Sequence, residues 1–274
     1  MVSYIHMGTK NKRPLISIIT CTLNSEKYLK ENIKSVGEQS FKDFEHIFID
    51  GYSSDRTLKI IGQYKKGKNN IHLHKQKPTG ISSAMNAGIM KAKGDYIMHL
   101  HSDDKLASKV SLKRAAVLAK RENCPDMLIG KIIEINAEGK ALGKFPPAWI
   151  FNLPDNFLNF VNFIPHQGVI MKRSIFLRYD KFDSKYKYCM DYDLWLRVYK
   201  DIRKIFLDYP ISKYRVHDLA NSFNKAHTEK IREEYKKVQF SYSPKMLHGI
   251  ISIFDEIIQT YVFLKRSYQK WRSA

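Results

Sequence analysis

Strand-like and helix-like segments alternate along the first hundred residues, and this alternation limits the possible folds more than any other feature. Short runs rich in β-branched residues are each followed by a polar loop, and they lie at 15–22, 45–49, 71–74 and 96–100. Alternation at this spacing predicts an α/β fold with a mixed, mainly parallel sheet covered by helices. Ligands of such sheets bind beyond the carboxyl ends of the strands, so the polar loops there are candidate site loops.

The charge of the chain is its most unusual bulk property. Its 274 residues include 47 basic and 27 acidic side chains, a net charge of +20, with an ordinary 43% of apolar residues. Between Arg56 and Gly94 there are nine Lys or Arg and no acidic residue. Such a segment suits phosphate-bearing ligands, anionic lipid or nucleic acid, or else forms a solvated positive face.

Cysteine usage and hydropathy exclude several classes of protein. Cys21, Cys124 and Cys189 are too few and too scattered for a disulfide framework or a paired-cysteine zinc site. The first residues lack the apolar stretch of a secretory signal, and no run approaches the ~20 apolar residues of a membrane helix. We therefore expect a soluble or peripheral protein in a reducing compartment.

The loop HSDD, residues 101–104, follows the fourth predicted strand and is the strongest candidate for chemistry. The adjacent carboxylates of Asp103 and Asp104 repel one another unless a cation or hydrogen bonds compensate them, and Mg²⁺ and Mn²⁺ prefer such oxygens. Because Mg²⁺ completes its shell with phosphate oxygens and water, the loop favours a nucleoside diphosphate ligand. The alternative is a pair of turn or capping residues.

Two further aspartates lie at ends of predicted elements. Asp50 ends the second strand, where a carboxylate can bind a base or ribose or can cap the next helix. MDYDLWLRV, residues 190–198, predicts a helix that presents Asp191 at its start, a position suited to a general base. At four-residue spacing, an ion pair with Arg197 is the favoured interpretation of Asp193.

The second half of the chain is less regular. The segment 145–163 is rich in Pro, Asn and aromatic residues, and we interpret it as a mobile or acceptor-facing insertion. Apolar residues at three- and four-residue spacings over 250–264 predict an amphipathic helix, followed by a basic C-terminus. This helix packs on the domain or on a second subunit in a homodimer, or it lies on an anionic membrane.

Four motifs, taken in order, resemble the inverting glycosyltransferases of family 2, in particular their bacterial surface-polysaccharide branch. The motifs are ISIITCTLNSEKYL, IDGYSSDRT, GISSAMNAGIMKAKGDYIMHLHSDD and MDYDLWLRV. The resemblance implies a GT-A domain over 14–220, with a donor half 14–105 and an acceptor half 106–220. An N-terminal extension, 1–13, and a basic helical extension, 221–274, complete the expected organisation.

The resemblance also implies a site for a nucleotide-sugar donor and a divalent metal, Mn²⁺ or Mg²⁺. Its catalytic base corresponds to Asp191, and Asp103 and His217 correspond to metal positions. The implied donor-binding residues are Thr20, Thr22, Asp50, Gly80, Asn86, Asp103 and Asp104. On the acceptor side we place His166, Gln167 and Asp193.

Three positions depart from the family pattern: His101 replaces Asp or Asn, Leu23 replaces an aromatic residue, and Met190 replaces Glu. The sequence thus predicts a metal-dependent hexosyltransferase that uses a UDP-sugar, or alternatively a GDP-sugar. Its acceptor is a lipid-linked or growing glycan at the cytoplasmic face of the inner membrane. The alternatives are a nucleic-acid-binding protein, for which no recognition motif is found, and a family member that binds sugar nucleotides without turnover.

Overall fold

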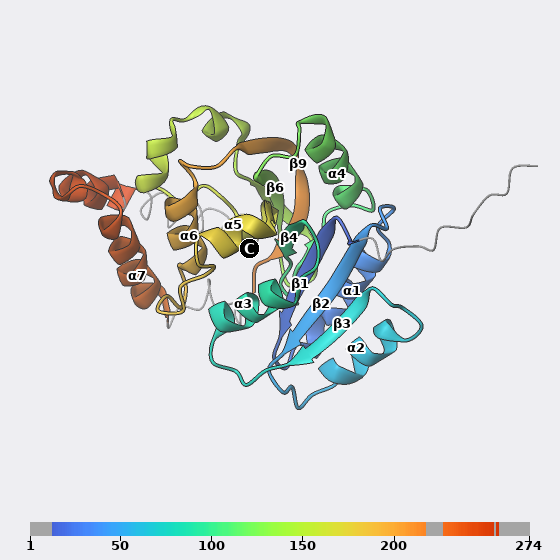
Figure 1. Ribbon diagram of the computed structural model, residues 1–274. Coiled ribbons are helices and arrows are strands. Elements are labelled where there is room, and N and C mark those ends of the chain that lie inside the picture. Colours follow the sequence, from blue (N-terminus) through green and yellow to red (C-terminus); the bar gives the residue numbers. More distant parts are fainter. Residues whose placement is uncertain (1–12, 218–226, 255, 258–274) are drawn as a thin grey trace, which may run out of the picture.

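A mixed sheet forms the centre of the computed structural model, which describes residues 13–217, 227–254 and 256–257 (Figure 1). The strand order is β3-β2-β1-β4-β8-β6-β9-β5, and β7 pairs with β6 outside this path. The strands are β1 (Ile16–Thr22), β2 (Phe44–Asp50), β3 (Ile71–Lys75), β4 (Tyr96–His99), β5 (Lys105–Leu106), β6 (Met127–Ile135), β7 (Ala141–Phe145), β8 (Val169–Lys172) and β9 (Lys204–Arg215).

Helices cover both faces of the sheet. Along β1, Ile18 packs with Leu112 of α4, whereas its neighbour Ile19 packs with Met85 and Ile89 of α3. Both faces of a strand are therefore buried, which explains the continuous apolar run in the sequence. The helices are α1 (Glu26–Gly37), α2 (Thr57–Lys65), α3 (Ile81–Lys91), α4 (Ser111–Arg121), α5 (Arg173–Arg178), α6 (Met190–Val198) and α7 (Thr228–Ser241).

The parallel half of the sheet aligns the loops that follow its strands. Strand β1 pairs in parallel with β2 and β4, and its last residue, Thr22, lies opposite Asp50. The loops that start at Leu23, Gly51 and Leu100 consequently leave the sheet at one edge. The first half of the chain thus has the parallel α/β arrangement that the sequence predicts.

The acceptor half differs from the sequence expectation in its connections. The last strand, β9, extends over Lys204–Arg215. Pro210 interrupts the apolar pattern within this strand, and the pairing of β9 with β6 shifts register beside it. Strand β7, which is mostly exposed, and the short helix α5 were not anticipated, because neither has a clear hydrophobic period.

The segment 145–163 is not a separate insertion. It forms two short 3₁₀ turns, Ala148–Asn152 and Asp155–Asn159, and buries Ile150, Leu158 and Phe163 in the same core as α6. In this segment, an aromatic and proline-rich composition without periodicity therefore corresponds to a chain that is irregular in structure but packed in the core.

Helix α7 of the C-terminal extension lies beside α6 (Figure 1) and packs onto the domain. Val238 and Gln239 are fully buried, and the ring of Tyr235 stacks on that of Tyr192 in α6 at 4.8 Å. Residues 248–254 and 256–257 are also helical, and the remaining part of the expected amphipathic helix, 258–264, lies outside the described residues together with the basic C-terminus.

Gly168, just before β8, tests how closely the second half of the sheet is packed. A Cβ at this position would lie 2.3 Å from the carbonyl oxygen of Gly130 in β6. We expect Gly168→Ala to lower the free energy of unfolding by about 1–3 kcal/mol, measured by urea titration. Gly143→Ala, an exposed position where a Cβ meets nothing within 4 Å, is the matched control. Equal midpoints for the two variants would contradict this packing.

Candidate functional site

A cavity of about 620 Å³ opens where the carboxyl ends of β1 and β2 face the start of α6. Its size is typical of sites for drug-sized or nucleotide-sized ligands. Polar and charged side chains from both halves of the chain meet in it. Its lining includes Thr22, Leu23, Ser25, Gly51, Gln76, Lys77, Gly80, His101, Ser102, Asp103, His166, Gln167, Lys187, Tyr188, Met190, Asp191 and Tyr214.

Asp103 is the carboxylate of the HSDD loop that reaches this cavity. Its Oδ2 atom lies 2.9 Å from Nε2 of His217, a residue just beyond the end of β9. Burial opposes ionisation, but the hydrogen bond from His217 brings the pKa of Asp103 below its usual value. A carboxylate and an imidazole from distant segments thus form a paired set of oxygen and nitrogen donors, suited to a divalent cation.

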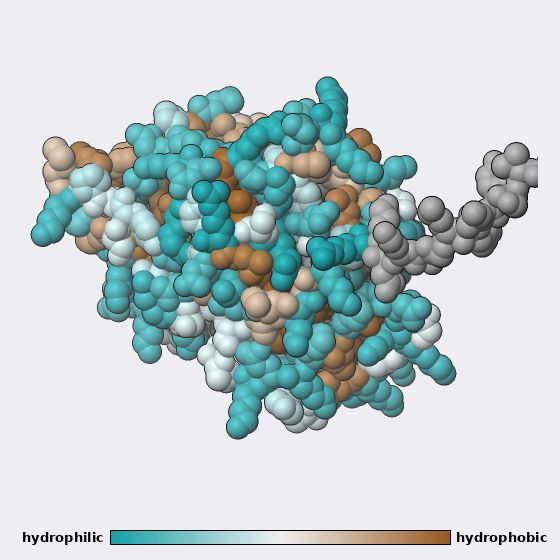
Figure 2. Space-filling view, viewed as in Figure 1, coloured by the Kyte–Doolittle hydropathy of each residue, from teal (hydrophilic) through white to brown (hydrophobic). Residues whose placement is uncertain are grey.

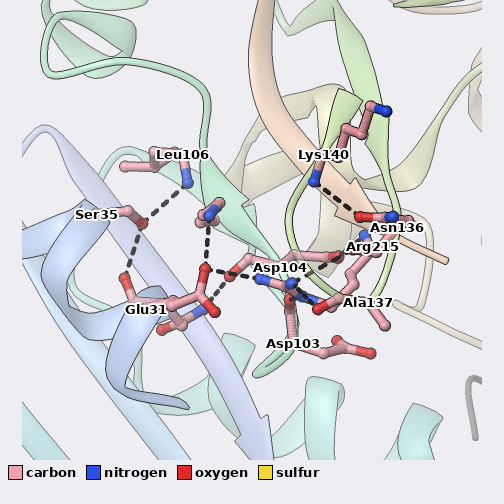
Figure 3. A network of polar contacts seen from close by, with 11 residues as sticks. Glu31, Ser35, Asp103, Asp104, Leu106, Asn136, Ala137, Lys140 and Arg215 are labelled. Carbon is pink, nitrogen blue, oxygen red and sulfur yellow. Dashed lines mark hydrogen bonds and ion pairs between the residues drawn. The ribbon is translucent and has the colours of Figure 1, made fainter. Parts of the chain in front are cut away.

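Arg215 holds these two segments together (Figure 3). Its side chain is fully buried, and its Nε donates to the main-chain carbonyl of Asp103 at 3.0 Å. Its Nη2 bonds Glu31 of α1 at 2.9 Å, and its main-chain amide donates to Oδ1 of Asp104 at 2.8 Å. Figure 3 shows the Asp103 carboxylate pointing away from this network. The network therefore fixes the loop while it leaves Asp103 available to the cavity.

Asp191 lies in the first turn of α6, as the sequence predicts, and lines the same cavity as Asp103. Its Oδ1 atom accepts the amide of Tyr192 at 2.8 Å. Burial raises the pKa of Asp191 to about 6, and the negative charge of Glu234 acts in the same direction. This carboxyl is half-buried, is held through its Oδ1 atom and has a pKa near neutrality. Such a group can accept a proton from a bound hydroxyl.

The imidazoles of His101 and His166 form one wall of the site, and that of His99 is buried next to His166. His166 stacks on His101 with ring centroids 5.2 Å apart and lies 5.5 Å from His99, both from the end of β4. Burial lowers the pKa of His166 well below its usual value, so the ring is neutral. Both ring nitrogens of His166 are buried without a protein hydrogen-bond partner. Since unpartnered buried polar atoms are costly, these nitrogens suit a bound hydroxyl or water.

Several residues expected in the donor site lie behind its wall instead. Thr20 is fully buried, and its hydroxyl donates to the carbonyl of Leu100 at 2.8 Å. Asp50 is also fully buried, and its carboxylate accepts the hydroxyls of Thr22 and Ser53 and the Ser53 amide. Thr22 and Gly80, by contrast, line the cavity. Position along the strand explains the difference between the two threonines, because Thr22 is the last residue of β1 whereas Thr20 lies two residues further inside the sheet.

Three further expected site residues make structural contacts away from the cavity lining. The amide of Asn86 bonds the main chain of Phe182, which joins α3 to the acceptor half. Burial and the neighbouring charge of Asp103 raise the pKa of Asp104, whose role is to receive Arg215. Asp193, 1% exposed, pairs with Arg197 at 2.8 Å, as the four-residue spacing predicts, so its acceptor-side assignment is corrected.

Sequence reasoning missed Lys77, Lys187 and Tyr188, all of which line the cavity. Lys187 and Tyr188 directly precede the helix that carries Asp191, and Lys77 lies in the loop after β3. Their places in loops next to site residues are the signal that could have found them. They add two cations to a cavity that already contains two carboxylates.

The fold is that of GT-A glycosyltransferases. The Staphylococcus aureus protein TarS, residues 1–349 in complex with UDP-GlcNAc, matches with a TM-score of 0.65 and 22% identity, over 81% of this chain and 65% of that one. The mannosyltransferase PcManGT from Pyrobaculum calidifontis, in complex with GDP-Man and Mn²⁺, matches with a TM-score of 0.61 and 14% identity, over 88% and 69%. The predicted GT-A fold is thereby confirmed.

The chain belongs to glycosyl transferase family 2, whose family model matches residues 17–180. An uncharacterized glycosyltransferase of Methanocaldococcus jannaschii is 28% identical over 81% of this chain and 78% of its own length. The putative teichuronic acid biosynthesis glycosyltransferase TuaG of Bacillus subtilis is 32% identical over 49% of this chain and 53% of its own. The resemblance noted from the four motifs is confirmed, and the protein is a glycosyltransferase.

Asp191 allows a test of its environment that needs no substrate. Its pKa is about 6 in the folded protein against an ordinary 3.8, so the folded state binds the proton more tightly. Stability therefore decreases as pH rises from about 4 to 6, and the full cost, up to about 3 kcal/mol, applies above pH 6. We expect Asp191→Asn to stabilise the protein at pH 7.5 by up to this amount and to have little effect at pH 4, measured by urea unfolding.

Asp180→Asn is the control for this experiment, because the side chain of Asp180 is 98% exposed. An Asp191→Asn variant whose stability tracks that control at every pH would show that Asp191 is not destabilised by burial.

Proposed function

We propose that this protein is a metal-dependent, inverting glycosyltransferase that moves a sugar from a nucleotide-sugar to a hydroxyl of a lipid-linked or growing glycan. The supporting observation is that Asp103 and Asp191, 88 positions apart in the chain, line one cavity. Their placement gives one carboxylate for the diphosphate side and one for the acceptor hydroxyl. The relatives named for teichuronic acid and PGL/p-HBAD biosynthesis support cell-surface polysaccharide synthesis as the setting.

Asp103 and His217 are the residues that would hold Mn²⁺ or Mg²⁺. The described part of the chain has no cluster of three or more His, Cys, Asp or Glu side chains suited to a metal. Two protein ligands are nevertheless sufficient where diphosphate oxygens and water complete the shell. When bound, the metal supplies neutralising charge for the departing diphosphate. Lys77 and Lys187, which line the same cavity, add fixed positive charge for that group.

Asp191 acts as the base in this proposal. It accepts the proton of the acceptor hydroxyl as the oxygen attacks the anomeric carbon, and the bond to the diphosphate breaks on the opposite side. A single displacement of this kind inverts the anomeric centre. With a pKa of about 6, Asp191 is ionised at neutral pH yet basic enough to take a proton, and it becomes inactive as the pH falls below 6.

Sugar hydroxyls are the proposed partners of the imidazole wall. The unpartnered nitrogens of His166 and the side chain of Gln167 lie on the acceptor half of the cavity. Neutral imidazoles donate and accept one hydrogen bond each, which suits a hydroxyl that does both. His101, stacked on His166, stands where the family pattern has Asp or Asn.

A UDP-sugar is the proposed donor, with a GDP-sugar as the alternative. TarS was solved with UDP-GlcNAc and PcManGT with GDP-Man, so the fold accommodates both kinds of nucleotide. Thr22 and Gly51 line the cavity and are the proposed contacts of the nucleoside, and Asp50 supports this part of the wall through hydrogen bonds with Thr22 and Ser53. The family assignment removes the basis for nucleic-acid binding as the main activity.

The proposal predicts different effects for the two carboxylates. With a panel of UDP-, GDP- and dTDP-sugars and Mn²⁺, we expect Asp191→Asn to lower donor hydrolysis and transfer by about 10²–10⁴-fold while donor affinity is retained. Asp103→Asn should instead weaken metal-dependent donor binding, measured by calorimetry with and without Mn²⁺. Asp180→Asn should behave like the wild type. Donor binding without any turnover by the wild type would favour the alternative of a binding protein.

An anionic membrane surface is the proposed partner of the C-terminal extension, at the cytoplasmic face. Ile251 is fully buried, whereas Ile250, Ile253 and Ile257 are 48%, 60% and 60% exposed. These three side chains recur at three- and four-residue spacing and form an exposed apolar stripe on the helix. Most of the surface in Figure 2 is hydrophilic by contrast. The sequence beyond the stripe carries four cations. No helix among the described residues is long and apolar enough to cross a membrane.

Sedimentation with phosphatidylglycerol vesicles tests this partner. A charge in the stripe opposes insertion of its apolar face, so we expect Ile253→Asp to weaken vesicle binding by roughly 5- to 30-fold, corresponding to about 1–2 kcal/mol. Val117→Asp on α4, where the side chain is 57% exposed, is the matched control. Unchanged vesicle binding together with loss of a dimer in Ile253→Asp would instead identify the stripe as a subunit interface.

A further inference from the structure

Glu234 lies in α7 of the C-terminal extension, outside the cavity, and makes an unusual set of contacts. Its Oε1 atom accepts the amides of Tyr188 and Cys189 at 2.6 and 2.7 Å, and its Oε2 atom accepts the amide of Lys187 at 3.0 Å. One carboxylate therefore binds three consecutive main-chain amides. Charge-assisted hydrogen bonds of this kind are among the strongest in proteins.

The three amides belong to the loop that leads into α6. Cys189 is the N-cap of α6, and its own side chain does not cap the helix. Glu234 instead accepts the amide of the N-cap residue and the two amides before it, so another helix fixes the chain where it enters α6. The loop is functional as well, since the side chains of Lys187, Tyr188 and Asp191 all line the cavity.

Other contacts of α7 hold Glu234 itself in place. The Sγ atom of Cys189 lies 3.9 Å from the carbonyl of Ile231, one turn before Glu234. On the other side, Tyr235 stacks on Tyr192 and accepts the amide of Asn162 at 2.7 Å. Since these contacts surround the Glu234 carboxylate, its position is fixed relative to the start of α6.

We propose that Glu234 is a positioning residue for Asp191: its carboxylate fixes the loop 187–189 and so sets where the first turn of α6 presents the Asp191 side chain. The inference rests on the proposed function of Asp191 as the base. Glu234 touches neither the cavity nor the reacting atoms, so it acts through the loop and through its charge.

The charge of Glu234 has a second consequence. It raises the pKa of Asp191 in the same direction as burial does, whereas the amides of the first turn of α6 lower it. The charged and titratable groups around Asp191 also include those of its own loop, Lys187, Tyr188 and Cys189, and those elsewhere in the cavity lining, Lys77, His101, Asp103 and His166. Glu234 is the acidic group that α7 adds to this set.

Glu234→Gln tests the inference, with Glu233→Gln as the matched control. The control removes the same charge from the preceding, exposed position of α7. We expect Glu234→Gln to speed hydrogen exchange of the amides of residues 187–189 about tenfold, because charge-assisted hydrogen bonds are lost. It should also move the titration of the Asp191 carboxyl, followed by carbon NMR, to lower pH. Glu234→Asp, which keeps the charge, should restore the titration.

Transfer kinetics complete the test. We expect kcat of Glu234→Gln to fall roughly 10- to 100-fold because the base is displaced. The KM for the donor should rise by less than kcat falls, because the loop carries Lys187 but the rest of the donor site is intact. If Glu234→Gln matches the Glu233→Gln control both in hydrogen exchange at residues 187–189 and in the titration of Asp191, the inference is overturned. This holds even if Asp191→Asn abolishes transfer. If the wild type transfers no sugar, the proposed function fails, and exchange and titration still decide whether Glu234 positions Asp191.

Discussion

The site depends first on the burial of Arg215. A guanidinium with no exposed surface is tolerated only if its donors are paired, and Arg215 pairs them with the carbonyls of Asp103 and Ala137 and with Glu31. These partners come from three different segments, so the hydrogen bonds that satisfy one buried charge also fix the relative positions of α1, the HSDD loop and the end of β9. His217 follows two residues later and reaches Asp103 for this reason.

The parallel half of the fold was predictable because its strands β1, β2 and β4 are buried on both faces and leave apolar runs in the sequence. The full length of β9 was not predictable because register shifts beside Pro210 interrupt its pattern, and β7, the other strand that pairs with β6, is too exposed to have one. The segment 145–163 was misinterpreted for a related reason. Its buried residues, such as Leu158 and Phe163, are held by irregular turns, and hydrophobic periodicity carries no information about such turns.

The site was predictable where residue type and strand position were sufficient, as for Asp103 and Asp191. The site was not predictable where the direction of a side chain decides whether the residue reaches the cavity. Asp50 and Asp104 come from the same kinds of loop ends, but hydrogen bonds to Ser53 and Arg215 turn them inward. Lys187 was missed because its role depends on a loop whose conformation is fixed by α7, about forty-five residues later in the sequence.

Two segments from the C-terminal part of the chain, the end of β9 and helix α7, thus hold the two halves of the site. They do so with side chains of opposite charge. The HSDD loop presents carbonyls and is held by the cation Arg215, whereas the loop before α6 presents amides and is held by the anion Glu234. The electrostatic consequences differ accordingly. The pKa of Asp103, beside His217, is below its usual value, and that of Asp191 rises to about 6. Environments that move two carboxyl pKa values in opposite directions give them different chemical tasks, one suited to permanent charge and cations, the other to exchange of a proton. The separation of roles therefore follows from the surroundings of each carboxyl, with His217 beside Asp103 and burial together with the Glu234 charge at Asp191, and not from the aspartates themselves.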